Sequence, residues 1–169
     1  ADFTYGYSHS IRDGVCRPIL FPSYEGELTW LSDGREHRAT FEDGLTFERQ
    51  RERLKTALLQ ETWLGPVLSD AHAELQRLRK QEQADAGGLI VTMNQDHARQ
   101  VADLVLKLTG TRALVAVSDD PSASKTIETF AHHKQQQWLV AVNMVSEGVD
   151  IPRLRVGVYA TNVLTEMYF

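Results

Sequence analysis

The sequence predicts an α/β protein in which a parallel sheet carries helices on its faces. Three observations in the second half lead to this fold class. Short apolar runs rich in β-branched residues recur there, segments with helical spacing of apolar residues separate them, and the connections are short. Strands that alternate with helices through short loops pair in parallel. The runs predicted as strands are 89–93, 112–117, 138–142 and 155–160.

Two helices are predicted between these strands. The first runs from about His97 to Thr109 behind an N-cap at Asn94 or Asp96, and Gly110 is a suitable stop. Its predicted inner face is formed by Ala98, Val101, Leu104, Val105 and Leu108. The second predicted helix covers residues 124–132 and buries Ile127 and Phe130.

The first half has a different pattern. The run Ile19–Phe21 and the alternating segment Glu27–Leu31 predict a β-hairpin or small meander, with a further turn at Ser32–Gly34. A helix is expected from Phe47 to Thr62, and Trp63–Pro66 should break or bend it before a long amphipathic helix that ends near Gln83. We therefore divide the chain into an accessory segment, residues 1–85, and an α/β domain, residues 86–169.

Composition bounds the class of protein. The chain has 169 residues, a net charge of −5 and one cysteine, Cys16, which excludes a disulfide framework. No apolar run approaches the ~18 residues that span a bilayer. These features predict a cytoplasmic protein without a membrane partner. The first residue, Ala1, and the apolar last residue, Phe169, lead us to expect a piece of a longer protein.

Polar residues follow three of the predicted strands. They are Thr92 and Asn94, Ser118 and Asp119, and Asn143, Gly148 and Asp150. The carboxyl ends of parallel strands face one ligand-binding crevice, so these side chains should gather there. Asp150 could accept hydrogen bonds from ribose hydroxyls, and Gly148 would permit close backbone approach. The same spacing equally fits a simple loop in which Asp150 only satisfies backbone amides.

The sequence lacks the parts for nucleotide hydrolysis. It contains neither a G-x-x-x-x-G-K-[ST] phosphate loop nor a G-x-G-x-x-G fingerprint. The pair Asp119-Asp120 precedes Pro121, a pattern more typical of a turn than of a magnesium site. We assign no catalytic residue and no metal ligand.

Two segments resemble helicase motifs. GLIVTMNQDHARQVADLV (Gly88–Val105) resembles motif IV of superfamily 2 DEAD/DEAH-box helicases, and VAVNMVSEGVDIPRLRVGVYAT (Val140–Thr161) resembles their motif V. The likeness is greatest to the restriction subunits of type III and type I restriction enzymes. More loosely, YSHSIRDGVCRP (Tyr7–Pro18) resembles the segment that joins the two RecA-like domains of such enzymes.

The resemblance implies a second, C-terminal RecA-like domain, with the P-loop NTPase type of sheet, that ends before motif VI. Gly148 and Asp150 match positions near the ATP ribose. Asn94, Val142, Asn143 and Thr161 match positions that contact nucleic acid; Val142 stands where a phosphate-binding Thr is common, which favours a backbone contact. ATP with Mg²⁺ would be held mainly by the first RecA-like domain of the same protein, which is the implied partner together with nucleic acid, DNA in preference to RNA.

The resulting expectation is a fragment of an ATP-dependent helicase or translocase that is inactive by itself. The alternative is a non-catalytic module with a degenerate RecA-like fold that docks nucleic acid or protein, since a fold alone does not define an activity.

Overall fold

A computed structural model describes residues 7–13, 27–32, 35–40, 46–142 and 151–162. The described elements are five helices and six strands. In chain order they are α1 (Tyr7–Arg12), β1 (Glu27–Ser32), β2 (Arg35–Thr40), α2 (Phe47–Leu59), α3 (Glu61–Gln81), β3 (Gly87–Thr92), α4 (Gln95–Thr109), β4 (Leu114–Ala116), α5 (Ala123–His132), β5 (Trp138–Val142) and β6 (Leu154–Ala160).

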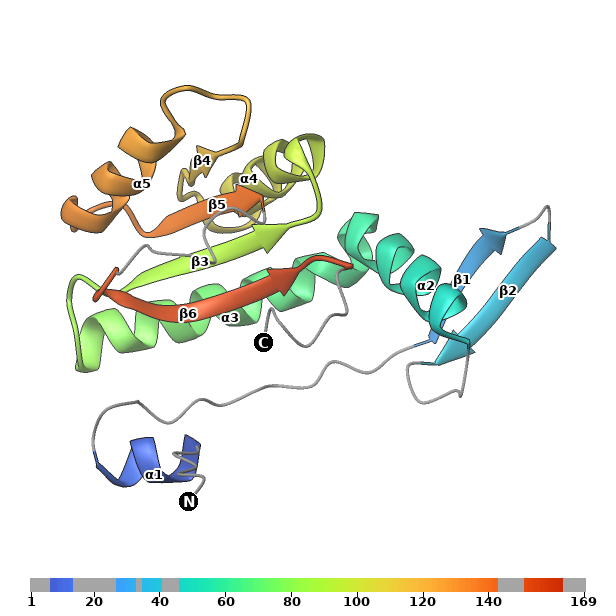
Figure 1. Cartoon of the computed structure of the whole chain (residues 1–169), viewed down its shortest axis with the longest axis horizontal. Coiled ribbons are helices and arrows are strands. Elements are labelled where there is room, and N and C mark those ends of the chain that lie inside the picture. Colours follow the sequence, from blue (N-terminus) through green and yellow to red (C-terminus); the bar gives the residue numbers. More distant parts are fainter. Residues whose placement is uncertain (1–6, 14–26, 33–34, 41–45, 143–150, 163–169) are drawn as a thin grey trace, which may run out of the picture.

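Four strands form one parallel sheet in the order β4-β5-β3-β6 (Figure 1). Helices flank both faces. Apolar side chains of α3 and α4 pack on one face against Ile90 and Val140, and Phe130 of α5 packs on the other against Leu139 and Ala141. The predicted α/β class is therefore confirmed, and this arrangement is consistent with the RecA-like fold that the resemblance implies.

The start of the sheet depends on glycine for close packing. A Cβ on Gly88 would lie 2.2 Å from the indole ring of Trp138, so a side chain there would displace the ring. Trp138 is 1% exposed, and its Nε1–H donates to His72 Nδ1 at 3.1 Å. The Trp138 side chain thus joins β5 to α3 and lies against Gly88 of β3.

The α/β elements were predicted closely. Strand β5 has the predicted bounds, Asn94 is the N-cap of α4, and Gly110 ends that helix in the left-handed conformation with φ 67°. One residue of the predicted inner face, Leu108, is not buried: its side chain is 41% exposed. It lies in the last turn of α4, at the side of the helix where Gly65 of α3 offers no side chain to cover it.

One prediction in the first half was wrong, and one strand was not predicted. The strand predicted at Glu27–Leu31 is confirmed as β1; its partner β2, at residues 35–40, was not predicted, and the predicted run Ile19–Phe21 lies outside the described residues. The helix break falls at Gln60 rather than at Trp63–Pro66, and α3 continues through Pro66. Proline removes one backbone hydrogen bond, but Leu64 and Leu68 on either side of it are buried in the core, and their packing offsets the loss.

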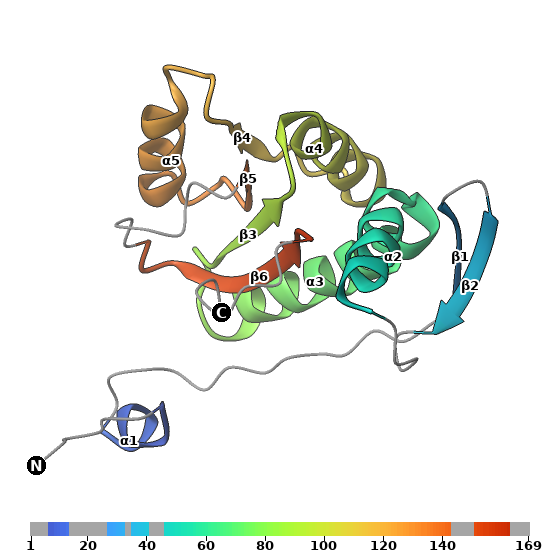
Figure 2. The same cartoon turned by 45° about the vertical axis from the view of Figure 1, so that its right-hand side comes forward.

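Helix α3 lies in the segment that the sequence analysis treated as accessory. Its residues Leu64, Leu68, Leu75 and Leu78 belong to the same core cluster as the sheet residues Ile90 and Val158. The hairpin β1–β2 and α2 lie beyond the arrowheads of β3 and β6 in both views (Figures 1 and 2). None of the described helices combines the length and apolar character needed to cross a bilayer.

Candidate functional site at the carboxyl edge of the sheet

Three strands end side by side at one edge of the sheet. Thr92 of β3 is in register with Val142 of β5 on one side and with Ala160 of β6 on the other. The residues that follow these strands therefore leave the sheet at one edge, as the sequence analysis expected of a parallel sheet. The segments that resemble motifs IV and V are neighbours in space.

The end of β3 is tightly organised. The Thr92 side chain is fully buried, and its hydroxyl donates to the Ala141 carbonyl oxygen at 3.1 Å, so it ties β3 to β5. Asn94 is exposed, and its Oδ1 accepts from the His97 N–H at 2.9 Å as the N-cap of α4. Capping occupies the side-chain amide oxygen of Asn94 and leaves its NH₂ group at the surface.

His97 joins this edge to α2. The ring is 2% exposed; Nε2 lies 3.0 Å from the Leu58 carbonyl oxygen, and Nδ1 lies 3.4 Å from the Met93 backbone nitrogen. A neutral imidazole with its proton on Nε2 satisfies both contacts, because Nδ1 then accepts. Burial lowers the pKa of His97, and the bond to Leu58 only partly opposes this shift.

The acceptor of this bond is a carbonyl in the last turn of α2, which has no partner within its own helix. His97 therefore caps α2 from the α/β domain. His97 was not predicted as a functional residue. The sequence feature that could have indicated its role is its place four positions before Val101, a polar residue on the apolar face of the helix.

The other residues predicted to contact nucleic acid or ATP differ from Asn94 in their burial or lie outside the described part of the chain. Val142 is half-buried against the core, and Thr161 is 3% exposed. Asn143, Gly148 and Asp150 lie outside the described residues. The roles assigned to all of these residues and to Asn94 remain predictions.

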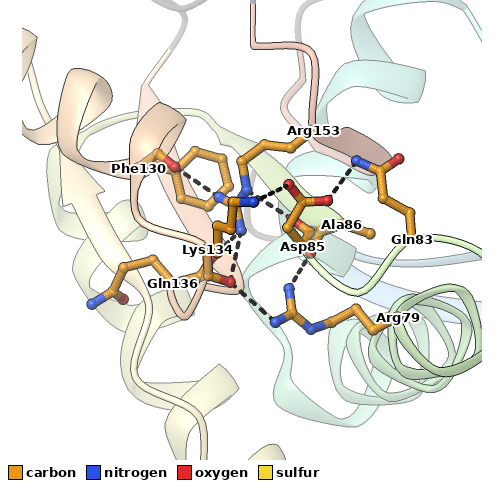
Figure 3. Close-up of polar contacts among 8 residues, drawn as sticks. All are labelled: Arg79, Gln83, Asp85, Ala86, Phe130, Lys134, Gln136 and Arg153. Atoms are coloured by element: carbon orange, nitrogen blue, oxygen red, sulfur yellow. Dashed lines mark hydrogen bonds and ion pairs between the residues drawn. The ribbon is translucent and has the colours of Figure 1, made fainter.

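The chain that follows residue 150 is fixed at the opposite edge of the sheet by Arg153 (Figure 3). Its guanidinium donates to the carbonyl oxygens of Asp85 at 2.8 Å, Phe130 at 2.7 Å and Gln136 at 2.5 Å, with a longer contact to Lys134 at 3.4 Å. The guanidinium carbon also lies 4.5 Å from the centre of the Phe130 ring. Burial and the nearby Arg79 lower the Arg153 pKa.

This arrangement, termed here the Arg153 clamp, ties the beginning of β6 to the α3–β3 connection and to the end of α5. Arg79 adds bonds to the carbonyls of Ala86 and Lys134 (Figure 3). The clamp was missed at the sequence level because backbone carbonyls, its main partners, have no sequence signature.

No family model matches the sequence. The chain is 43% identical over 171 residues to the uncharacterized proteins Rv2917 of Mycobacterium tuberculosis and ML1624 of Mycobacterium leprae. Each match covers 100% of this chain and 28% of the relative, so the chain spans less than a third of these proteins.

Among solved structures, the helicase domain of Pyrococcus furiosus Hef is similar, with a TM-score of 0.43 and 18% sequence identity. The similarity covers 68% of this chain and 30% of that one.

Proposed function

We propose that this chain is part of an ATP-dependent nucleic-acid helicase or translocase and forms its second RecA-like domain. One observation carries the proposal. The two segments that resemble motifs IV and V are adjacent parallel strands, β3 and β5, that end in register at one edge. The two resemblances therefore concern one edge of the sheet, the carboxyl edge, which is where parallel α/β sheets bind their ligands.

In the proposed mechanism, the carboxyl edge is one wall of a site that a first RecA-like domain completes. Gly148 and Asp150 approach the ribose of ATP, and Asn94, Asn143, the backbone at Val142, and Thr161 contact the nucleic-acid strand. Because these residues follow adjacent β-strands, a change at the nucleotide is transmitted directly to the residues that contact the nucleic acid. Phosphoryl transfer needs a phosphate cradle, Mg²⁺ and a stabilising cation, and the proposal assigns these to the rest of the protein.

DNA is the proposed polymer, following the likeness to restriction subunits. Contacts to the backbone alone give little sequence specificity, so the proposed enzyme moves along strands of any sequence.

The test uses the intact protein that contains this chain. We expect ATP hydrolysis that DNA stimulates, and an Asp150→Ala variant that folds normally but loses most of this stimulated turnover. Asp103→Ala is the matched control, because it removes an exposed carboxylate from the middle of α4, where no ligand contact is proposed. An intact protein without nucleic-acid-stimulated hydrolysis refutes the proposal. Binding of a DNA strand without any hydrolysis of ATP would instead support a docking module.

A further inference from the structure

Helix α2 extends beyond the sheet at the candidate site. Its C-terminal half is anchored, because Ala57 and Leu58 are buried and His97 binds the Leu58 carbonyl oxygen. Its first residue, Phe47, is 56% exposed. At about 1.5 Å per residue, the helix carries Phe47 roughly 16 Å from Leu58. Both views place α2 beyond the carboxyl ends of β3 and β6 (Figures 1 and 2).

The face of α2 that packs on the core continues along this extension. Leu54 and Leu58 pack against the main core. Residues spaced by three or four positions share a helix face, so Arg51 and Phe47 continue the same line toward the N-terminus. Lys55 follows Arg51 by one helical turn on the same side. We call Phe47, Arg51 and Lys55 the α2 stripe.

The stripe has the chemistry of a nucleic-acid contact. All three side chains are exposed, and neither Arg51 nor Lys55 forms an ion pair within the described part of the chain. Among the exposed side chains of α2, three are basic and two are acidic, whereas the full sequence has a net charge of −5. An exposed aromatic ring beside unpaired cations binds single strands, because bases stack on the ring while cations neutralise phosphates.

We propose that the α2 stripe binds a single nucleic-acid strand that passes over the carboxyl edge of the sheet. Phe47 stacks on a base, and Arg51 and Lys55 contact successive phosphates. His97 is the positioning residue that holds α2 against this edge. The inference rests on the proposed function, since that function brings the strand to Asn94, at the base of the same helix.

The test measures the binding of a fluorescent single-stranded oligo-dT of about 20 nucleotides, longer than the ~4–16 nucleotides that one site covers. The intact protein is compared with Phe47→Ala and with the double variant Arg51→Gln/Lys55→Gln. The matched control is Arg49→Gln/Lys80→Gln, which removes the same charge from exposed positions off the stripe. Arg49 is on another side of α2, and Lys80 is near the end of α3 at the opposite edge of the sheet.

Loss of a stacked base should weaken binding by about 5- to 150-fold in Phe47→Ala. Loss of two phosphate contacts should reduce the slope of log affinity against log salt by about 1.4 in the stripe double variant. The control should keep the slope of the parent. Circular dichroism verifies that all variants are folded.

The outcomes separate the two proposals. If the parent binds the strand and the stripe variants bind as the control does, the inference is refuted while the helicase assignment stands. If the parent binds no strand, both are refuted. A Phe47→Ala variant that loses as much affinity for a blunt duplex as for the single strand would refute stacking at Phe47, since duplex bases are already stacked.

Discussion

Replacement of Arg153 by Met should strongly destabilise the α/β domain. Methionine keeps much of the aliphatic volume but removes every donor of the Arg153 clamp. Three carbonyl oxygens, those of Asp85, Phe130 and Gln136, then lose donors at 2.8 Å or less. A buried polar group without a partner costs about 1–3 kcal/mol.

The expected loss of stability is about 3–5 kcal/mol, near the lower end of the sum over three carbonyls, because the bonds to Asp85 and Gln136 are only partly buried. That is a large part of the ~5–15 kcal/mol that holds an ordinary domain together. Urea unfolding followed by far-ultraviolet circular dichroism measures it. With a slope of about 2 kcal/mol per molar urea, the midpoint should fall by about 2 M.

Arg77→Met is the control. It removes a guanidinium that pairs with Glu74 and Glu82 on the exposed side of α3, where solvent screens such pairs. Its midpoint should hardly move. Arg153→Lys should be nearly as damaging as Arg153→Met, because an ammonium cannot reach three divergent carbonyls from one planar fork. A loss below about 1 kcal/mol in Arg153→Met would refute the assignment of stability to the clamp.

Three further predictions concern the pH dependence, the packing and the activity. His97→Gln should flatten the pH dependence of stability: burial lowers the folded-state pKa below 6.5, so the neutral ring stabilises the fold above pH 6.5 and this contribution is lost as the pH falls. Urea unfolding at about pH 7.5 and 5.5 measures it, and an unchanged pH dependence contradicts the prediction. Gly88→Ala should cost about 1–3 kcal/mol and change the near-ultraviolet signal of Trp138, whereas Gly157→Ala, with no neighbour within 4 Å of the added carbon, should change neither; equal effects would contradict the packing argument. The isolated 169-residue chain should release no phosphate from ATP in a nucleic-acid-stimulated assay, and measurable release would overturn the division of labour proposed above.

The α/β half was readable from sequence because its signals are local. Apolar runs set the strands, Asn94 and Gly110 set the ends of α4, and short connections imposed parallel pairing. The location of the candidate site followed from the same logic, since residues after parallel strands share one edge.

The sequence by itself determined the fold class, the positions of the four strands of the parallel sheet and the likeness to motifs IV and V. Only the tertiary structure decided that Pro66 lies inside α3, that His97 caps α2, and that Arg153 binds three separate carbonyls. The physical reason is the range of the interactions. The Asn94 cap and the strand patterns depend on residues a few positions apart, whereas His97 and Leu58 are 39 residues apart and Arg153 and Asp85 are 68 apart. Such contacts form only when the core brings distant segments together.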